Sequence, residues 1–401
     1  MFSLTGLPPG VRRAFKWDAL SALIGGLSSG ALYPFLGVIL RRDLHASPYL
    51  IALLGTAFSV GNLFNPLMAH SMRNRAKLPY AVWPPIIGRT LFLLMPLARA
   101  APTFVGITVL GSAFGSLAAP AYAAVIRDAY PVERRGRLMG FVRVLSVGAS
   151  MIGALCGGVA LRYISYRWFF PAAALVGVAG VCAFSRIGVP AAPDQPAPSD
   201  ARMLDAFRIV AADRIFGLYS MAFFFHALGN LILSPVFPVF QVDLLHISNQ
   251  WVAYLSTAAS GMGMVGYLCW GRVLDRRGPF RLLLFVLLVA SIGPITYYFA
   301  HSVPVLLIAA AAQGLAMAGG DLGYVNASMR FAPRQLVVSY AAVFAFLQSM
   351  RGIPGPFIGA ALSQWIGPRS VFLVTLALWV AAATVASVGA RAARDREQAA
   401  R

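Results

Sequence analysis

The sequence has few charged residues, and few of those are acidic. Only 11% of its 401 residues are charged and 59% are hydrophobic, whereas about a quarter of the residues of a soluble domain carry charge. Such a chain has too little polar surface to fold in water, which excludes a soluble globular protein. Basic residues number 33 against 13 acidic ones, but no basic patch interleaved with aromatic residues accompanies them, so we expect no nucleic-acid binding.

Cysteine is nearly absent as well. The three cysteines, Cys156, Cys182 and Cys269, fall in apolar segments, and their odd number and position predict buried thiols rather than disulfides. The chain also shows no nucleophile paired with a base, no His/Glu metal pair and no phosphate-cradling loop. We therefore expect neither an enzyme nor a bound metal or cofactor.

Long apolar stretches make up most of the chain. Twelve of them are long enough to cross the roughly 30 Å of bilayer hydrocarbon as α-helices, which predicts an all-α membrane protein. The predicted spans are Trp17 to Leu40, Pro48 to Met72, Leu78 to Leu97, Thr103 to Ile126, Leu138 to Leu161, Trp168 to Phe184, Ile215 to Val242, Gln250 to Trp270, Leu282 to Phe299, Val303 to Met329, Leu336 to Trp365 and Val371 to Val388.

The chain contains an internal duplication. Residues 233–277 align with residues 32–76 without a gap and match at thirteen of 45 positions, among them His45 with His246 and Ser47 with Ser248; chance gives roughly one match in ten in so apolar a sequence. A repeat of half the chain is typical of transporters built from two similar bundles. We expect six-helix bundles at 1–186 and 214–401, joined by a polar, Pro-rich cytoplasmic linker at 187–213.

The basic residues indicate the orientation of the chain. If both termini and the loops that follow even-numbered spans are assigned to one side, that side holds 24 of the 33 Lys and Arg residues. Basic residues concentrate on the cytoplasmic side of membrane proteins. We therefore expect a multi-pass protein of a bacterial inner membrane with both termini in the cytoplasm.

The loop between the eighth and ninth predicted spans resembles a known family motif. It reads GRVLDRRGPFR, which is similar to the Gly-x-x-x-Asp-Arg-x-Gly-x-x-Arg hairpin of the major facilitator superfamily. The matching residues are Gly271, Asp275, Arg276, Gly278 and Arg281, and in the first half Asn74 stands at the acidic position and Arg75 follows it. The resemblance implies that family's fold, twelve helices in two pseudo-symmetric bundles. It also implies a gating hairpin whose acidic residue meets a helix of the other half.

In this family the first, fourth, seventh and tenth spans line a central cavity. The resemblance therefore implies a substrate cavity made by Ser21, Gly25, Ser28, Tyr122, Tyr219, Phe223, His226, Asn230, Gln313, Met317 and Tyr324. Aromatic, thioether and polar side chains with few charges suit a small, partly apolar organic molecule. In the alternative interpretation, the Ser and Gly residues only allow close helix packing and His226 is a hydrogen-bonded core residue.

Carboxylates inside the predicted spans are candidates for proton coupling. Asp321 lies near the middle of the tenth span, and an intramembrane carboxylate indicates a functional site by default. The alternative is a structural ion pair between Asp321 and Arg351 of the next span. Asp18 is a further candidate, although it lies within a turn of the cytoplasmic end and could be solvated there.

Glycines in the fifth and eleventh spans resemble the Gly-Pro-x-x-Gly-Gly signature of exporters in the family. The fifth span supplies Gly153, Gly157 and Gly158, with Ala154 where proline belongs, and the eleventh supplies Gly355, Pro356 and Gly359. The alternative is tight helix packing, which small residues four apart also permit. In the third span, Arg89 is expected to need a carboxylate, carbonyl or water partner, because a buried guanidinium is costly.

Together these features predict a secondary active transporter that works by alternating access. We expect proton-coupled export, as an efflux antiporter, of a small, partly apolar organic molecule. The alternative is a nutrient or metabolite importer, or an uncoupled facilitator, of the same fold. Its partners are then the substrate, protons and membrane lipids, and we expect a monomer.

Overall fold

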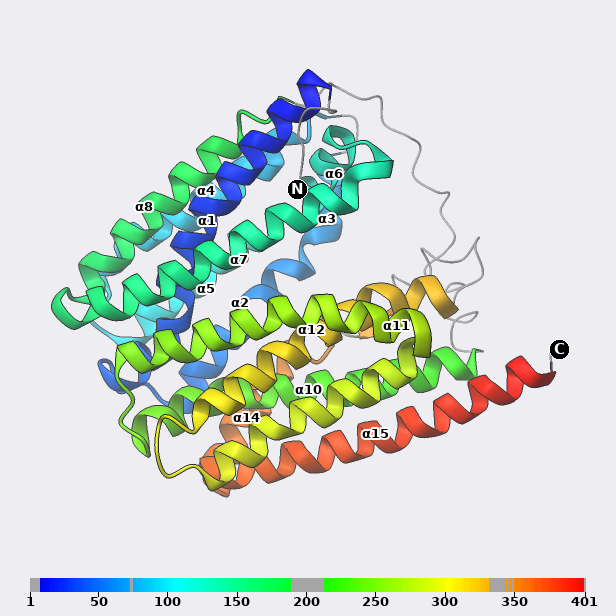
Figure 1. Cartoon of the computed structure of the whole chain (residues 1–401). Coiled ribbons are helices and arrows are strands. Elements are labelled where there is room, and N and C mark those ends of the chain that lie inside the picture. Colours follow the sequence, from blue (N-terminus) through cyan, green and yellow to red (C-terminus); the bar gives the residue numbers. More distant parts are fainter. Residues whose placement is uncertain are drawn as a thin grey trace. The chain divides into compact units, whose positions relative to one another are not determined.

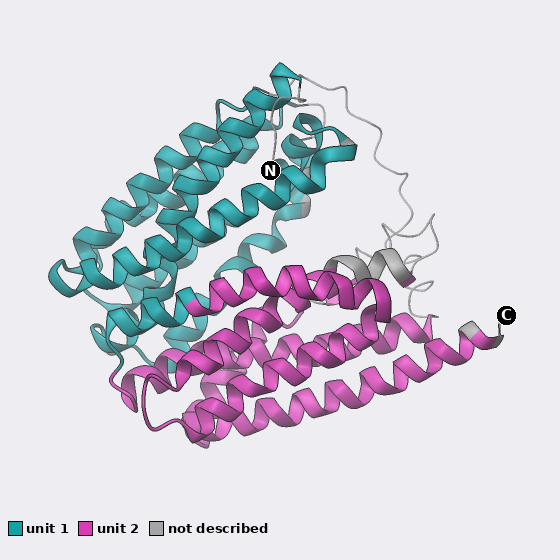
Figure 2. Ribbon diagram, viewed as in Figure 1, with its two compact units in different colours: residues 1–195, 247–257 teal, residues 196–246, 258–401 magenta. Residues whose placement is uncertain are grey.

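The computed structural model describes residues 8–72, 75–188, 213–331, 340, 343–344, 346–347 and 350–399. Within these ranges the regular elements are helices (Figure 1). The chain divides into two compact units (Figure 2): unit 1 contains Met1–Gln195 and Ile247–Thr257, and unit 2 contains Pro196–His246 and Ala258–Arg401. In this division Ile247–Thr257 groups with unit 1, and the predicted domains at 1–186 and 214–401 stay a prediction.

Unit 1 is organised around its first helix. Helix α1 (Pro9–Arg42) packs along α7 (Val132–Tyr163) and α8 (Tyr166–Phe184), and the three run side by side in Figure 1. The remaining elements are α2 (Pro48–Leu63), α3 (Asn65–Ser71), α4 (Leu78–Leu91), the 3-10 helix η1 (Phe92–Leu97), α5 (Ala101–Ser116) and α6 (Ala119–Ala129). Of these, α5 packs against both α2 and α4.

Unit 2 is organised in the same way around α10 (Arg214–Asp243). This helix packs along α15 (Pro368–Ala399) and α14 (Pro354–Trp365). The other helices are α11 (Asn249–Phe299) and α12 (Leu306–Phe331). Half of the eleventh predicted span before α14 lies outside the described residues.

The described helices account for the predicted spans with several differences; the third span consists of α4 and η1, and the fourth of α5 and α6. Nine helices in the described ranges are long and apolar enough to cross a membrane. Helix α11, with 51 residues, contains both the eighth and the ninth predicted spans, because only Gly278 interrupts it, at φ 77° and ψ 174°. The second predicted span is divided at Phe64 into the 16-residue α2 and the short α3.

The duplication is visible in the backbone. His45 and His246 have φ of 47° and 48°, and they are the only non-glycine residues with positive φ in the part of the chain that the structure describes. Each stands just before a serine that caps the following helix: the Ser47 hydroxyl accepts from the Leu50 amide, and the Ser248 hydroxyl accepts from the Trp251 amide, both at 3.4 Å. The left-handed conformation costs about 1–2 kcal/mol at such residues, so its repetition shows that the two copies share one turn geometry.

Helices α1 and α7 touch backbone to backbone. A methyl group added at Gly153 would overlap the carbonyl oxygen of Leu27, and one at Gly30 would overlap the carbonyl oxygen of Ser150. At Gly157 the added carbon would lie 2.8 Å from the ring of Phe35. Glycine at these positions is what lets the two helices approach so closely.

The other predicted packing glycines occupy comparable contacts. A β-carbon at Gly158 would lie 2.6 Å from the Ala253 side chain. In unit 2, a methyl group at Gly359 would overlap the carbonyl oxygen of Ile232, and Gly355 and Pro356 are buried beside it at the start of α14. This contact holds α14 tightly against α10.

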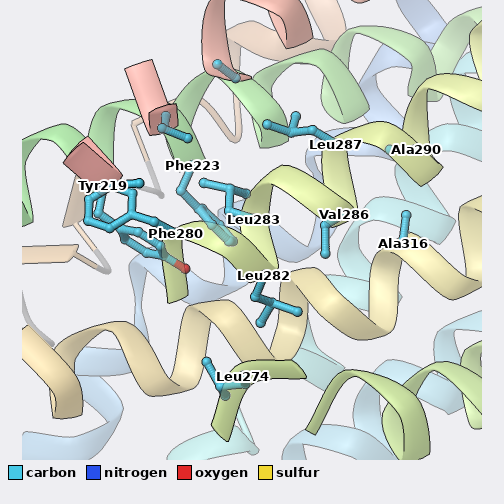
Figure 3. Close-up of a cluster of buried hydrophobic side chains, with 14 of the residues drawn as sticks. Tyr219, Phe223, Leu274, Phe280, Leu282, Leu283, Val286, Leu287, Ala290 and Ala316 are labelled. Atoms are coloured by element: carbon cyan, nitrogen blue, oxygen red, sulfur yellow. The ribbon is translucent and has the colours of Figure 1, made fainter. Parts of the chain in front are cut away.

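The core of unit 2 is rich in aromatic rings. Tyr219 is fully buried and packs against Phe280 and Phe344, and its hydroxyl donates to the carbonyl oxygen of Gly323 at 3.1 Å. Figure 3 shows Tyr219, Phe223 and Phe280 beside the aliphatic side chains of α11. This rigid core supports one wall of the pocket described below.

The cysteines differ from the prediction. Cys156, Cys182 and Cys269 are free, as expected, but all three are exposed rather than buried. In a membrane protein an apolar side chain on the outer face of a helix contacts lipid and not water. A thiol exposed there therefore costs no free energy of hydration.

Candidate functional site

A pocket of about 370 Å³ lies within unit 2. Its lining residues are Phe223, His226, Ala227, Asn230, Leu231, Ala290, Gln313, Ala316, Met317, Gly320, Asp321, Tyr324, Arg351 and Trp379. A volume of a few hundred Å³ with mostly apolar walls and a few polar groups is typical of small-molecule sites.

The pocket brings together most of the residues predicted from the second half. Helix α10 contributes Phe223, His226 and Asn230 at steps of three and four, and α12 contributes Gln313, Met317, Asp321 and Tyr324 in the same way. This spacing places side chains on one face of a helix. Tyr219, one turn before Phe223, does not line the pocket because its ring is buried in the aromatic core.

His226 is held firmly by its neighbours. The residue is 5% exposed, and its backbone carbonyl accepts hydrogen bonds from Trp379 Nε1 at 2.9 Å and from Asn230 Nδ2 at 3.2 Å. Its ring packs against those of Phe223 and Trp379. Among the described residues, nothing donates to or accepts from its buried Nδ1 atom.

Arg351 contributes a guanidinium group to the pocket. The guanidinium carbon lies 6.0 Å from the ring centre of Phe223 and 5.9 Å from that of Phe224, within cation–π range. Its buried Nε and Nη1 atoms have no hydrogen-bond partner in the described ranges. An unsatisfied buried donor costs about 1–3 kcal/mol, so an acceptor group on a bound molecule would gain by meeting it.

Asp321 is an exposed carboxylate in the same pocket. The Tyr267 hydroxyl donates to Asp321 Oδ2 at 2.5 Å, at the short end of the range for a bond between two oxygens. Within the described residues, no ion pair joins Asp321 to Arg351, the arrangement considered as an alternative from the sequence. The two opposite charges therefore stand in one pocket without direct contact.

Asp18 occupies a separate position in unit 1. It is 2% exposed, so the expectation that it could be solvated is wrong: the hydroxyls of Tyr130 and Tyr122 donate to its two oxygens at 2.6 and 3.4 Å. Burial, followed by the nearby Asp18 charge, raises the pKa of the Tyr130 phenol above its ordinary value. The Tyr130 contact could not be predicted from the sequence, because α1 meets that residue only in the folded bundle.

The small residues predicted from α1 lie at the contact with α8. Ser28 Oγ donates to the carbonyl oxygen of Ala173 at 2.7 Å and accepts from Arg89 Nη1 at 2.8 Å. The partner of Arg89 is therefore a hydroxyl, rather than the carboxylate, carbonyl or water expected. Ser21 and Gly25 are half-buried on the same side of α1, against Gly180 of α8.

The predicted gating hairpin is partly described. Gly278 makes the sharp turn with a backbone conformation that only glycine adopts readily, and Asp275, Arg276 and Arg281 around it are exposed, while Gly271 precedes them on α11. In the first half, Arg75 Nη1 donates to the Tyr80 hydroxyl at 3.2 Å, and Asn74 lies outside the described residues. The contact of Asp275 with the other half stays a prediction.

Two aromatic residues at the pocket were not predicted from the sequence. Trp379 lines it and fixes His226, and Tyr267 holds Asp321. Trp379 is the only Trp or Tyr of α15, and an aromatic residue with a polar tip in an apolar helix is the one signal that could have pointed to it. Helix α11 holds several other tryptophans and tyrosines besides Tyr267, so nothing in the sequence singles that residue out.

Comparison with known proteins agrees with this architecture. A family model described as Major Facilitator Superfamily matches residues 19–301 and again 219–400. The uncharacterized MFS-type transporter YuxJ of Bacillus subtilis is 28% identical over 276 residues, covering 66% of this chain and 68% of that protein. Multidrug resistance protein MdtG of Serratia proteamaculans is 28% identical over 303 residues, covering 71% of this chain and 70% of that protein.

Solved structures show the same fold at low sequence identity. A bacterial homolog to the human lysosomal transporter Spinster, in an inward-facing and unoccupied conformation, has a TM-score of 0.70 at 15% identity and covers 96% of this chain and 98% of its own. The nucleoside transporter NupG has a TM-score of 0.73 at 12% identity and covers 94% of this chain and 98% of its own. The chain therefore belongs to the major facilitator superfamily and is a multi-pass membrane transporter of that family.

Proposed function

We propose that this protein is a secondary active transporter that exports a small, partly apolar organic molecule across a bacterial inner membrane in exchange for protons. The observation that carries the proposal is the pocket of unit 2, which combines aromatic walls with the two opposite charges of Asp321 and Arg351. Alternating access would expose this pocket to each side of the membrane in turn.

The lining of the pocket supports a substrate with an apolar body and a hydrogen-bond acceptor. Phe223, Tyr324, Met317 and Trp379 provide polarizable surface that fits a flat or aromatic ring. The unfilled nitrogen atoms of Arg351 provide donors at the edge of that surface. A molecule that offers an acceptor to these donors gains free energy, because they have no partner among the described residues.

Asp321 is the proposed proton carrier because its carboxylate is exposed in the pocket itself. With Asp321 ionised, its charge and that of Arg351 cancel formally; with Asp321 protonated, one positive charge remains. Substrate binding then depends on the protonation of Asp321. By linkage, proton binding to Asp321 depends in turn on whether the substrate is bound. Asp18 is less suited to this role, because it is enclosed and hydrogen-bonded by two tyrosines.

The export direction is supported by two independent features. Several relatives at 25–28% identity carry the name multidrug resistance protein MdtG. The glycines of α7 and α14 resemble the exporter signature of the family. The direction itself is measurable in vesicles.

The experiment uses purified protein in vesicles of bacterial lipid. A thermal-shift screen of neutral, cationic and anionic aromatic compounds first identifies a probe that the protein binds. Accumulation of that probe is then measured in vesicles that are acidic inside, acidic outside, or at equal pH. A proton antiporter accumulates the probe only when the interior is acidic.

Asp321→Asn is the test variant and Asp395→Asn is its matched control, since Asp395 is an exposed carboxylate on α15 away from the pocket. The substitution at Asp321 should abolish pH-driven accumulation while exchange at equal pH persists, and the control should behave like the original protein. Undiminished coupling in Asp321→Asn would exclude that residue as the carrier. Accumulation with an acidic exterior would favour a proton-coupled importer, and equilibration without any pH dependence an uncoupled facilitator.

A further inference from the structure

A second cavity, of about 470 Å³, lies in unit 2 at the end where α10 begins and α15 ends. Arg276, Arg277 and Arg281 of α11 and Arg394 and Arg396 of α15 line it, together with Asp213. The side chains of all five arginines are exposed. Arg276, Gly278 and Arg281 also belong to the predicted gating hairpin, but the proposed substrate and proton sites lie in the other pocket.

The positive charge of the cavity is not neutralised by its single acidic residue. Five arginines against one aspartate leave a formal charge of +4. The Asp213 carboxylate is already occupied: Oδ1 accepts from the backbone amides of Ile215 and Phe216 at 3.1 and 3.2 Å, and Oδ2 accepts from the Tyr340 hydroxyl at 3.0 Å. No ion pair in the described part of the chain involves any of the five arginines. Arg394 Nε donates to the carbonyl oxygen of Ala390 at 3.3 Å, and the guanidinium group of Arg277 lies over the ring of Phe285. A guanidinium group has five N–H donors, so all five arginines keep donors for an external anion.

The backbone adds to the positive electrostatic potential of the cavity. Gly278, with φ 77° and ψ 174°, breaks α11, and a new helical segment begins at Pro279. Gly278, Pro279 and Phe280 all line the cavity, so the beginning of that segment lies at its wall. The first turn of a helix carries a partial positive charge and free amide groups that favour an anion.

Apolar side chains form the rest of the wall. Ile215, Phe280, Phe331, Ala390 and Ala393 line the cavity beside the arginines, and Phe280 is 5% exposed. A small hydrophilic anion would gain nothing from this surface. An amphiphile with a phosphate at one end and hydrocarbon at the other would use both parts.

The position of the cavity fits such a ligand. It lies where the membrane-spanning segments Arg214–Asp243 and Pro368–Arg396 begin and end, respectively, and the distribution of basic residues predicts that this end faces the cytoplasm. Clustered arginines at the cytoplasmic membrane surface attract anionic lipid. We propose that this cavity is a binding site for an anionic phospholipid, with its phosphate among the arginines and the start of a chain against Phe280 and Phe331.

The test compares lipids and variants on the full-length protein in detergent. Binding of dioleoyl phosphatidylglycerol is measured by native mass spectrometry and by thermal shift, with dioleoyl phosphatidylcholine as the zwitterionic control. Inorganic phosphate and glycerol 3-phosphate serve as soluble anions. The test variant is Arg277→Gln with Arg394→Gln, and its matched control, Arg272→Gln with Arg391→Gln, removes two exposed arginines from the same two helices outside the cavity.

Phosphatidylglycerol should bind the original protein and the control variant alike, and should bind the test variant about 25-fold more weakly, since each arginine near an anionic headgroup corresponds to roughly fivefold in affinity. Binding should also weaken as salt is added. Equal binding by both double variants, or equal binding of the two lipids, would overturn the proposal. Competition by a soluble phosphate at the affinity of the lipid would overturn the lipid assignment.

If the test variant misfolds, a second double variant still tests the proposed lipid site. Arg277→Lys with Arg394→Lys keeps both charges and should retain most of the binding, so loss of binding in that folded variant would contradict an electrostatic site. The result is also separable from the proposed transport, because lipid binding is measured without a substrate or a proton gradient.

Discussion

Replacement of Tyr130 by phenylalanine tests the buried carboxylate of unit 1. The substitution removes the hydroxyl that donates to Asp18 Oδ2 at 2.6 Å and leaves only the Tyr122 hydroxyl, at 3.4 Å. A hydrogen bond to a charged group contributes about 1.5–3 kcal/mol, and Asp18, at 2% exposure, cannot turn to water instead. We expect Tyr130→Phe to lower the free energy of unfolding by about 2 kcal/mol.

The matched control is Tyr122→Phe, which removes the longer bond to the same carboxylate. It should cost less than about 1 kcal/mol, since the hydrogen bond weakens with length and both variants keep their rings. The loss of unfolding free energy in each variant is measured by unfolding the protein in mixed micelles with increasing SDS. In an Asp18→Asn background the effect of Tyr130→Phe should shrink, and a double-mutant cycle isolates the coupling. Equal losses in the two single variants, or zero coupling, would refute the reasoning.

The contact between Tyr130 and Asp18 also predicts that the stability of the protein depends on pH. Because the pKa of Tyr130 is raised above its ordinary value of 10.0 in the folded protein, the protonated phenol is favoured more strongly by the folded state than by the unfolded state. Its contribution is therefore fully present below pH 10 and is lost as the pH rises toward the folded-state pKa. The stability difference between the original protein and Tyr130→Phe should stay constant from pH 6 to 9 and shrink above about pH 10.

Three further substitutions test helix packing and the buried network of unit 1 and the turn at Gly278 in unit 2. Gly153→Ala should cost about 1–3 kcal/mol in the same unfolding assay because of the overlap with α1; Gly148→Ala on the same helix, which meets nothing within 4 Å, should be neutral, and equal effects would contradict the close contact. Gly278→Ala should cost about 1–3 kcal/mol, because the alanine is forced to positive φ. Ser28→Ala should cost about 1.5–3 kcal/mol, because it removes a bond from the Arg89 guanidinium; no loss in thermal stability would show that Arg89 finds another partner.

The pocket of unit 2 was largely predictable because it depends on helical periodicity. Phe223, His226 and Asn230 follow each other at steps of three and four on α10, so any helix there places them on one face. The resemblance to a family with a central cavity then predicted that this face lines a cavity. The contributions of Trp379 and Tyr267 could not be predicted in this way, because they depend on how α15 and α11 are rotated about their own axes.

The sequence by itself determined the class of the protein: its scarcity of charge requires lipid as the solvent, its apolar stretches require helices, and its repeat requires two similar bundles. These properties follow from hydropathy and from backbone hydrogen bonding, which act locally along the chain. Only the tertiary structure decided which polar groups meet. Asp18 bonds to a tyrosine 112 residues away and Arg89 to a serine 61 residues away, because partners across a helix interface are selected by packing geometry and not by spacing in the sequence.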